Sequence, residues 1–542
     1  MFRSIAPYGR ARTFQILAVF LVFCTLLSTL RLYGRQPPPP SIYDYTDGKT
    51  RGALQNETES AKPPSDETAY LRYLVREYGL TNEVPWFARR IRVQFDARAR
   101  KSMTEISGSR FATGDFQRVR TDDERLNLHV ESPVTVSVTR SATPDQVDAS
   151  SLLFGISTSY DRLMYGNSSL LYDWVRWLTD GKGASNGASL VLTLHHATTP
   201  EINHISGKLS DIGIDAVVLP AESAQDSTTR YLDLVHLLTQ RKDELQREGH
   251  EKKFFALVDD DVFFPSLGKL LARLGKYSPR KKFYIGLPSE QADWTVENNV
   301  TLTYGGGAVF LTPPMADSVS QLPCLNATAP PSSAPQTGQW DAALYTCLTT
   351  HTTTQLHILP SLYHPLSSPA AQYAGTSYAS GAQPLTLHHY KHRHLFAPSK
   401  SHLITSLCGE SCFLQRFLFK PDGWILVSGH SISAYPDGVA VATPPRSSGE
   451  KARVSERLVV DKADDAPDRK VVSWAGTKRT WRLLDARVEA GGAVWQAYVK
   501  RRGAPAAYAD EDDRVFEEDR VHTQDGPADV DSVIVLIWEP GP

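Results

Sequence analysis

Residues 253–264, KFFALVDDDVFF, place three consecutive aspartates directly after a short apolar run. The run at 253–258 is typical of a buried strand, and Asp259, Asp260 and Asp261 follow it at once. Carboxylates beside a core are costly unless something positive binds them, and Mg²⁺ or Mn²⁺ prefers hard oxygen ligands shared with substrate phosphates. A solvated acidic turn is the alternative interpretation, because an Asp-x-Asp sequence is frequent by chance.

Apolar runs and helical patterns alternate on the N-terminal side of this strand. The patterns predict strands at 152–156, 189–195 and 216–219, and helices at 169–178 and 231–248. This order is typical of an α/β fold with a central, mostly parallel sheet. Such a sheet binds ligands at the carboxyl ends of its strands, which is where the three aspartates would lie.

The 542 residues exceed what one hydrophobic core usually supports. Composition, apolar patterning and proline content change along the chain and divide it into segments. We predict a cytoplasmic tail at 1–13, a transmembrane signal anchor at 14–32, a stem at 33–66, a stem-proximal extension at 67–148, an α/β domain at 149–420 and a smaller β-rich appendage at 421–542.

The anchor prediction depends on residues 14–30, FQILAVFLVFCTLLSTL, which carry no charge and are about long enough to span a bilayer. Arg3, Arg10 and Arg12 precede this run without any acidic residue, so the positive-inside rule places the short tail in the cytoplasm. A cleaved signal peptide is the alternative, but the run is long and no small-residue cleavage site follows it. We therefore expect a single-pass type II protein of the Golgi or endoplasmic reticulum membrane, with its remaining residues in the lumen.

Net charge bears on the partners of the protein, and the cysteines and sequons bear on its compartment. A formal net charge of -2 and a pI near 6.8 argue against nucleic acid as the main partner. Beyond the anchor, the four cysteines leave three disulfide connectivities or free thiols open, and we predict the pairs Cys324–Cys347 and Cys408–Cys412. Four glycosylation sequons, each a weak signal alone, fit a lumenal location: Asn56, Asn167, Asn299 and Asn326.

Several segments between about residues 150 and 440 together resemble one enzyme family. They are LLFGISTSYDRL at 152–163, FFALVDDDVFF at 254–264, TYGGGAVFLTPPMA at 303–316, QWDAALYTCL at 339–348, HILPSLYHP at 357–365, LTLHHYK at 385–391 and CFLQRFLFKPDGWILVSGHSISAYPDG at 412–438. In their order and spacing, these segments resemble the fringe-like glycosyltransferases of family 31, especially the large fungal and plant branch. The resemblance is weaker toward residue 542 and absent before 150.

The resemblance implies a GT-A-type nucleotide-sugar-binding fold and an inverting transfer from a UDP-sugar to a glycan or glycoprotein acceptor. It implies that Asp259, Asp261 and His388 hold Mn²⁺ and that Asp260 faces the ribose or sugar of the donor. His389 is the competing choice for the histidine ligand, and a surface histidine pair without a ligand role is the alternative. Further donor contacts would come from Ser157, Thr158, Arg162, Gly305, Gly306 and Gly307.

Asp341 is the candidate catalytic base that the resemblance implies. An inverting transfer needs one positioned carboxylate to take the proton of the attacking acceptor hydroxyl. This chain departs from many relatives, which carry two acids in a row here, because Trp340 precedes Asp341 and Ala342 follows it. A helix N-cap is the structural alternative for Asp341.

Two other functions stay open on the sequence alone. The altered surroundings of Asp341 also fit a non-catalytic lumenal chaperone, partner subunit or glycan-binding protein that keeps the fold. A metal-dependent phosphatase or nucleotidase would use the same three aspartates, and its turnover would not depend on an acceptor.

Overall fold

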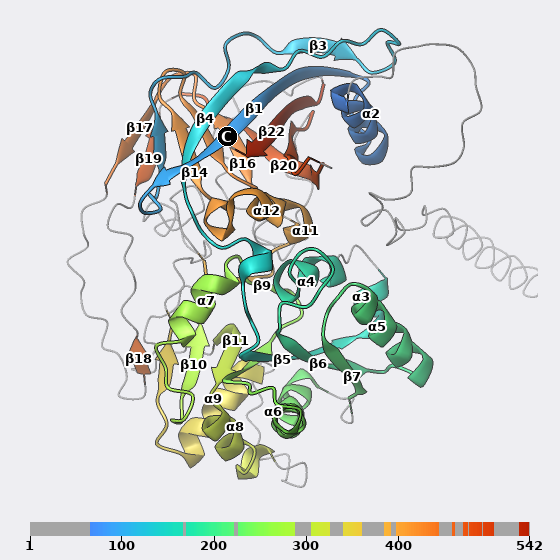
Figure 1. Cartoon of the computed structure of the whole chain (residues 1–542), viewed down its shortest axis with the longest axis vertical. Coiled ribbons are helices and arrows are strands. Elements are labelled where there is room, and N and C mark those ends of the chain that lie inside the picture. Colours follow the sequence, from blue (N-terminus) through green and yellow to red (C-terminus); the bar gives the residue numbers. More distant parts are fainter. Residues whose placement is uncertain are drawn as a thin grey trace, which may run out of the picture. The chain divides into compact units, whose positions relative to one another are not determined.

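The computed structural model describes residues 66–165, 170–221, 226–287, 305–325, 340–359, 384–391, 397–443, 458–460, 470–474, 476–489, 491–502 and 530–540. Residues 64–542 form one compact unit (Figure 1). The predicted tail, the predicted anchor, nearly all of the stem and all four sequons lie outside the described residues. Within the described part of the chain, no helix has the length and apolar character needed to cross a bilayer.

An eight-stranded sheet forms the centre of the α/β part, in the order β18-β12-β10-β11-β8-β5-β6-β7. All neighbouring pairs are parallel except the two that β11 makes, which confirms the predicted mostly parallel sheet. The strands are β5 (Leu152–Ser159), β6 (Ser189–His195), β7 (Ala216–Pro220), β8 (Phe254–Val258), β10 (Tyr284–Leu287), β11 (Gly305–Leu311), β12 (Leu356–Ile358) and β18 (Leu458–Val460).

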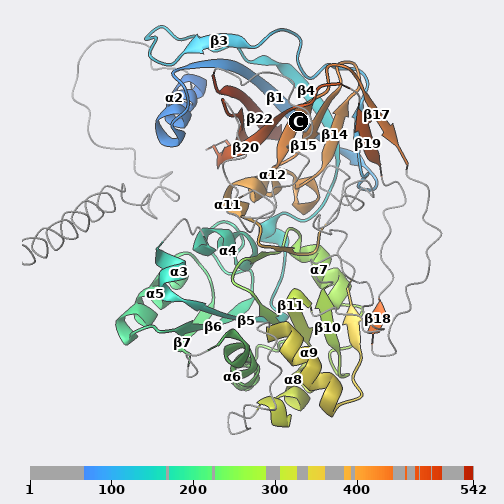
Figure 2. The same cartoon turned by 180° about the vertical axis from the view of Figure 1, so that it is seen from behind.

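Helices cover both faces of this sheet (Figures 1 and 2). Alternate residues of β8 pack into two separate cores, Phe254 on one face and Phe255 on the other, as expected for a strand buried on both sides. The Phe254 face packs against α4 (Leu170–Leu178), α5 (Thr199–Asp211) and α7 (Leu267–Leu274), and a short α3 (Tyr160–Met164) follows β5. The Phe255 face packs against α6 (Ser227–Arg247), α8 (Pro313–Val319) and α9 (Trp340–His351).

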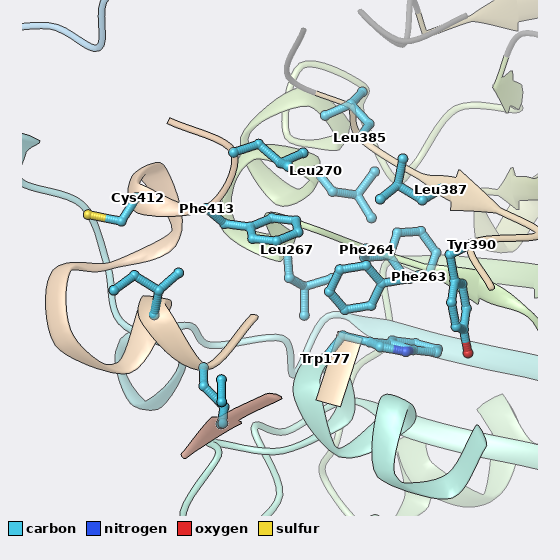
Figure 3. Close-up of a cluster of buried hydrophobic side chains, with 14 of the residues drawn as sticks. Trp177, Phe263, Phe264, Leu267, Leu270, Leu385, Leu387, Tyr390, Cys412 and Phe413 are labelled. Carbon is cyan, nitrogen blue, oxygen red and sulfur yellow. The ribbon is translucent and has the colours of Figure 1, made fainter. Parts of the chain in front are cut away.

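A two-stranded sheet follows β8 immediately. β9 (Val262–Phe263) pairs antiparallel with β13 (Leu387–His388), so Phe263 lies opposite Leu387. Both side chains are fully buried in an aromatic and aliphatic cluster that also contains Phe264, Tyr390 and Phe413 (Figure 3). The cluster holds two segments in place: Phe263 and Phe264, which follow the turn at 259–261, and Leu387 and Tyr390 on the paired segment.

A ten-stranded sheet joins the two ends of the described chain. Its order is β2-β14-β15-β16-β20-β21-β22-β1-β3, with β4 paired to β1. The strands are β1 (Glu83–Ala97), β2 (Thr104–Ile106), β3 (Gln117–Arg120), β4 (Glu131–Thr139), β14 (Arg416–Phe419), β15 (Trp424–Val427), β16 (Ser431–Ala434), β20 (Arg479–Val488), β21 (Val494–Lys500) and β22 (Ser532–Pro540). The parallel pairing of β1 with β22 places residues of the predicted stem-proximal extension and of the predicted C-terminal appendage in one sheet.

Smaller elements complete the described structure. The predicted stem-proximal extension begins with α2 (Asp66–Tyr78), whose Tyr70, Leu71 and Leu74 pack on the ten-stranded sheet. Further elements are α11 (Pro398–Ser401), α12 (Thr405–Cys408), the antiparallel pair β17 (Val439–Ala442) and β19 (Val471–Trp474), and four 3-10 helices, Pro144–Gln146, Pro323–Leu325, His402–Ile404 and Glu410–Cys412. The structure confirms both predicted disulfides, Cys324–Cys347 and Cys408–Cys412.

Candidate active site

The three aspartates form the turn between β8 and β9. The backbone N–H of Asp259 donates to the carbonyl oxygen of Gly307 on β11 at 3.0 Å. Asp260 is buried, with 7% of its surface exposed. Since β8 ends at Val258 and β9 begins at Val262, all three carboxylates lie at the carboxyl end of a central parallel strand.

Two histidines meet these carboxylates from a segment more than 120 residues further along the chain. The pairing of His388 with Val262 places His388 Nε2 3.2 Å from Asp259 Oδ2 and 3.3 Å from Asp261 Oδ1. His389 Nδ1 lies 2.8 Å from Asp261 Oδ2. Burial raises the pKa of Asp261, but hydrogen bonds and positive charge from His388 and His389 outweigh it and hold this pKa below its ordinary value.

Gly307 makes room for the first of these imidazoles. Its φ is +76°, in the left-handed region, and a Cβ at this position would lie 2.9 Å from His388 Nδ1. Gly305 and Gly306 precede it at the start of β11. The glycine predicted to contact the donor is therefore also the residue that allows the histidine to approach the aspartates.

Asp260 is held by the first strand and the turn after it. Thr158 Oγ1 donates to Asp260 Oδ2 at 2.5 Å, and Arg162 donates through Nε to Oδ2 at 2.5 Å and through a terminal nitrogen to Oδ1 at 2.7 Å. Burial raises the pKa of Asp260, against the opposing effect of Arg162. Both carboxylate oxygens thus already accept protein hydrogen bonds. Ser157 instead accepts a hydrogen bond from Arg230 Nε at 3.3 Å.

Asp341 lies in the first turn of α9, and its Oδ1 accepts the backbone N–H of Ala342 at 2.9 Å. Asp341 is therefore a residue of the first turn and not the N-cap that the sequence left open, because an N-cap precedes the helix and accepts from the N–H two or three residues later. It also lies close enough to Asp259 for the two carboxylates to interact. Burial, and next the neighbouring Asp259 carboxylate, raise the pKa of Asp341 from 3.8 to about 6. A carboxylate with such a pKa is suited to accept a proton near neutral pH.

Trp340 is a site residue that the sequence predictions did not include. Its indole Nε1 donates to Asp259 Oδ1 at 2.6 Å, and its ring stacks on Tyr231 with centroids 4.4 Å apart and planes inclined by 11°. The signal in the sequence was the departure from the resembling family around Asp341, which here lies between Trp340 and Ala342 instead of in a pair of acids. The structure shows that this tryptophan contacts the acidic turn directly.

The donor atoms of this cluster suit a divalent cation. Among the described residues, Asp261, His388 and His389 bring one ligand atom each within 4.8 Å of one another, and Asp259 contacts the same imidazole. Carboxylate oxygens and imidazole nitrogens together are ligands that Mn²⁺, Co²⁺ and Zn²⁺ accept. The structure thus brings together Asp259, Asp261 and His388, and it brings His389 to the same carboxylate.

We predict that Trp340→Phe weakens Mn²⁺ binding about 10- to 100-fold, the usual effect of removing a hydrogen bond that orients a metal ligand. The phenyl ring keeps a stacking partner for Tyr231 but loses the donor to Asp259. Isothermal titration of Mn²⁺ into the protein measures the change. Trp474→Phe, at a partly exposed position on β19, is the matched control and should leave the affinity unchanged. An unaltered Mn²⁺ affinity in Trp340→Phe would show that the indole does not orient Asp259.

Neither a protein-family model nor a curated protein matches this chain. Solved structures similar to part of it include the glycosyltransferase GlyE of Streptococcus pneumoniae TIGR4, with 12% identity, a TM-score of 0.28 and coverage of 44% of this chain and 53% of GlyE. A glycosyltransferase involved in glycosylation of the major capsid of PBCV-1 shows 10% identity, a TM-score of 0.24 and coverage of 45% and 97%. Mouse xyloside xylosyltransferase 1 shows 12% identity, a TM-score of 0.26 and coverage of 44% and 96%.

This chain therefore spans about half the length of GlyE. All three TM-scores lie below 0.5, so these similarities carry no argument about what this chain does. The function has to be inferred from the site itself.

Proposed function

We propose that the protein is a metal-dependent glycosyltransferase with a GT-A-type fold that transfers a sugar from a UDP-sugar to a glycan or glycoprotein. The observation that carries this proposal is the convergence at the carboxyl end of β8. There His388 Nε2 lies 3.2 Å from Asp259 and 3.3 Å from Asp261, beside a carboxylate, Asp341, whose pKa is raised to about 6. Such a transfer requires a metal ion that binds the diphosphate and a base that takes the proton of the acceptor hydroxyl.

Asp259, Asp261 and His388 are the residues that would hold the cation. When bound, a divalent cation stabilises the negative charge that develops on the departing diphosphate. Trp340 holds the Asp259 carboxylate through its indole N–H, and Gly307 leaves space for the imidazole of His388. Arg162 and Thr158 hold Asp260, so this residue stabilises the turn that carries its two neighbours.

Asp341 acts as the base in this proposal. Its carboxylate accepts the proton of the acceptor hydroxyl as that oxygen attacks the anomeric carbon, and the bond from that carbon to the diphosphate breaks on the opposite face. The configuration at the anomeric carbon is inverted. Burial favours the neutral acid, so the ionised form of Asp341 takes up the proton readily.

The family assignment and the location also belong to this proposal. The ordered motifs between 150 and 440 support a fringe-like enzyme of family 31. We propose that residues 14–32 anchor the protein in the Golgi or endoplasmic reticulum membrane and that the following residues are lumenal. Protection of the 64–542 unit from added protease in sealed microsomes tests this placement, and its digestion without detergent would refute it.

The experiment that tests the activity is UDP release by the full chain, solubilised in mild detergent, across a panel of UDP-sugars and glycan acceptors. We expect release that an acceptor stimulates, that EDTA abolishes and that added Mn²⁺ restores, with GDP-mannose as the donor control. Release that is independent of any acceptor would favour a phosphatase or nucleotidase. If the folded protein neither binds nor turns over any UDP-sugar, the non-catalytic alternative replaces the proposal.

A further inference from the structure

His388 and His389 are adjacent in sequence, yet both imidazoles face the same carboxylate. In an extended strand, successive side chains point to opposite faces. Here the two rings are stacked, with centroids 3.8 Å apart and planes inclined by 20°. The chain must therefore leave the strand conformation at this point.

The backbone of His389 makes this change of direction. Its φ is +54°, in the left-handed region, which is sterically unfavourable for a non-glycine residue. The chain on either side is anchored in the core: Leu387, two residues before His389, is fully buried opposite Phe263, and the hydroxyl of the next residue, buried Tyr390, donates to Asp173 at 3.0 Å (Figure 3). These anchors hold His389 in an unfavourable conformation.

The strained turn gives Asp261 one imidazole for each of its oxygens. His388 Nε2 lies 3.3 Å from Oδ1 and His389 Nδ1 lies 2.8 Å from Oδ2. Ligands at right angles around a cation with bonds of about 2.1 Å are themselves roughly 3.0 Å apart. The two His–Asp separations are compatible with ligands that share one ion, and the three ligand atoms all lie within 4.8 Å of one another. Orienting Asp261 alone would need only one imidazole and no left-handed residue.

We propose that His388 and His389 are both direct ligands, so that the metal site of this protein is an Asp-His-His centre completed by Asp259. The inference rests on the proposed function for the identity of the site and goes beyond it in the number of nitrogen ligands. Two imidazoles favour Mn²⁺, Co²⁺ and Zn²⁺ over Mg²⁺, which prefers oxygen ligands. His389 is then a residue that determines the choice of metal.

The test counts nitrogen ligands in the full chain loaded with Mn²⁺ alone, without donor or acceptor. Electron spin-echo spectroscopy should detect two coordinated imidazole nitrogens in the wild type and one in His389→Asn. Asparagine tolerates the left-handed backbone but removes the imidazole. We expect His389→Asn to weaken Mn²⁺ binding at least 10-fold by calorimetry and Mg²⁺ binding only a few-fold.

The matched control is His196→Asn. His196 is exposed, has a φ of +56°, and makes no contact with the acidic turn among the interactions of the described residues. The His196→Asn variant should keep two coordinated imidazole nitrogens and the wild-type affinity for Mn²⁺. A second variant, His389→Gly, relieves the left-handed strain, so it should unfold at no lower temperature than the wild type in EDTA and still lose one nitrogen.

The outcomes separate this inference from the proposed function. One coordinated nitrogen in the wild type, unchanged in His389→Asn, overturns the double-histidine site and leaves a metal-dependent transferase intact. Failure of the folded protein to bind Mn²⁺ at all overturns both. Equal weakening of Mn²⁺ and Mg²⁺ in His389→Asn would refute the role of His389 in metal choice.

Discussion

Asp261→Asn is expected to reduce acceptor-stimulated UDP release by on the order of 10²–10³-fold or more, the scale of losing a main electrostatic stabiliser of the departing charge. Asp261 is the carboxylate that both imidazoles contact, and the amide retains its size while removing its charge. Initial rates at saturating donor measure the loss of UDP release. Titration of Mn²⁺ by calorimetry measures the loss of metal affinity that should accompany it.

The control for this variant is Asp211→Asn, at an exposed position at the end of α5. It changes the net charge of the protein by the same amount and should leave both the rate and the Mn²⁺ affinity unchanged. Wild-type activity in Asp261→Asn would mean that the acidic turn is a solvated loop, and the metal-dependent mechanism would have to be abandoned.

Asp341→Asn is expected to reduce the rate of transfer about 10²–10⁴-fold while leaving Mn²⁺ and donor affinity within a few-fold of the wild type. The reason is that Asp341 would accept the proton of the acceptor and makes no direct contact with the proposed metal ligands in the described structure. Donor affinity is measured by titration of UDP, and the rate by transfer to the preferred acceptor.

The pH dependence gives a second readout for the same residue. Because the base must be ionised, the rate should fall as the pH falls through about 6, the pKa to which burial and next Asp259 raise Asp341. The folded pKa lies above the ordinary value of 3.8, so the folded state binds this proton more tightly than the unfolded state. The contribution of Asp341 to stability is therefore present at low pH and is lost as the pH rises from about 3.8 to about 6.

Asp341→Asn should remove this part of the pH dependence of unfolding, measured by denaturant titration between pH 4 and pH 7. Loss of activity without that change would leave the base unidentified. Unchanged activity would leave Asp341 with a structural role in the first turn of α9, and the base would have to be sought elsewhere.

The local elements were largely predictable because they depend on local patterns. The apolar run before Asp259 forms β8, and the runs around 152–156 and 189–195 form β5 and β6. The period of two or of 3.6 residues in apolar positions is set within each segment, and burial on both faces follows from an uninterrupted run. The position of the acids at the carboxyl end of a central strand followed from the order of these segments.

Pairings between distant segments were not predictable in the same way. Nothing in the pattern of residues 83–97 indicates that this strand pairs with 532–540, because apolar alternation fixes which face of a strand is buried and leaves its partner open. The role of Trp340 depends on a hydrogen bond to a residue 81 positions earlier, and it was visible in the sequence only as a departure from the resembling family.

The sequence by itself determined the α/β class, the acidic turn at 259–261 and the set of histidines and acids from which a site could form, because chemistry and periodicity are properties of single segments. Only the tertiary structure decided which of these groups meet. The pairing of β9 with β13 brings His388 to the aspartates, Gly307 leaves the space, and the left-handed backbone of His389 aims a second imidazole at Asp261. Backbone direction at a single residue depends on the packing of its neighbours, which the residue types alone do not specify.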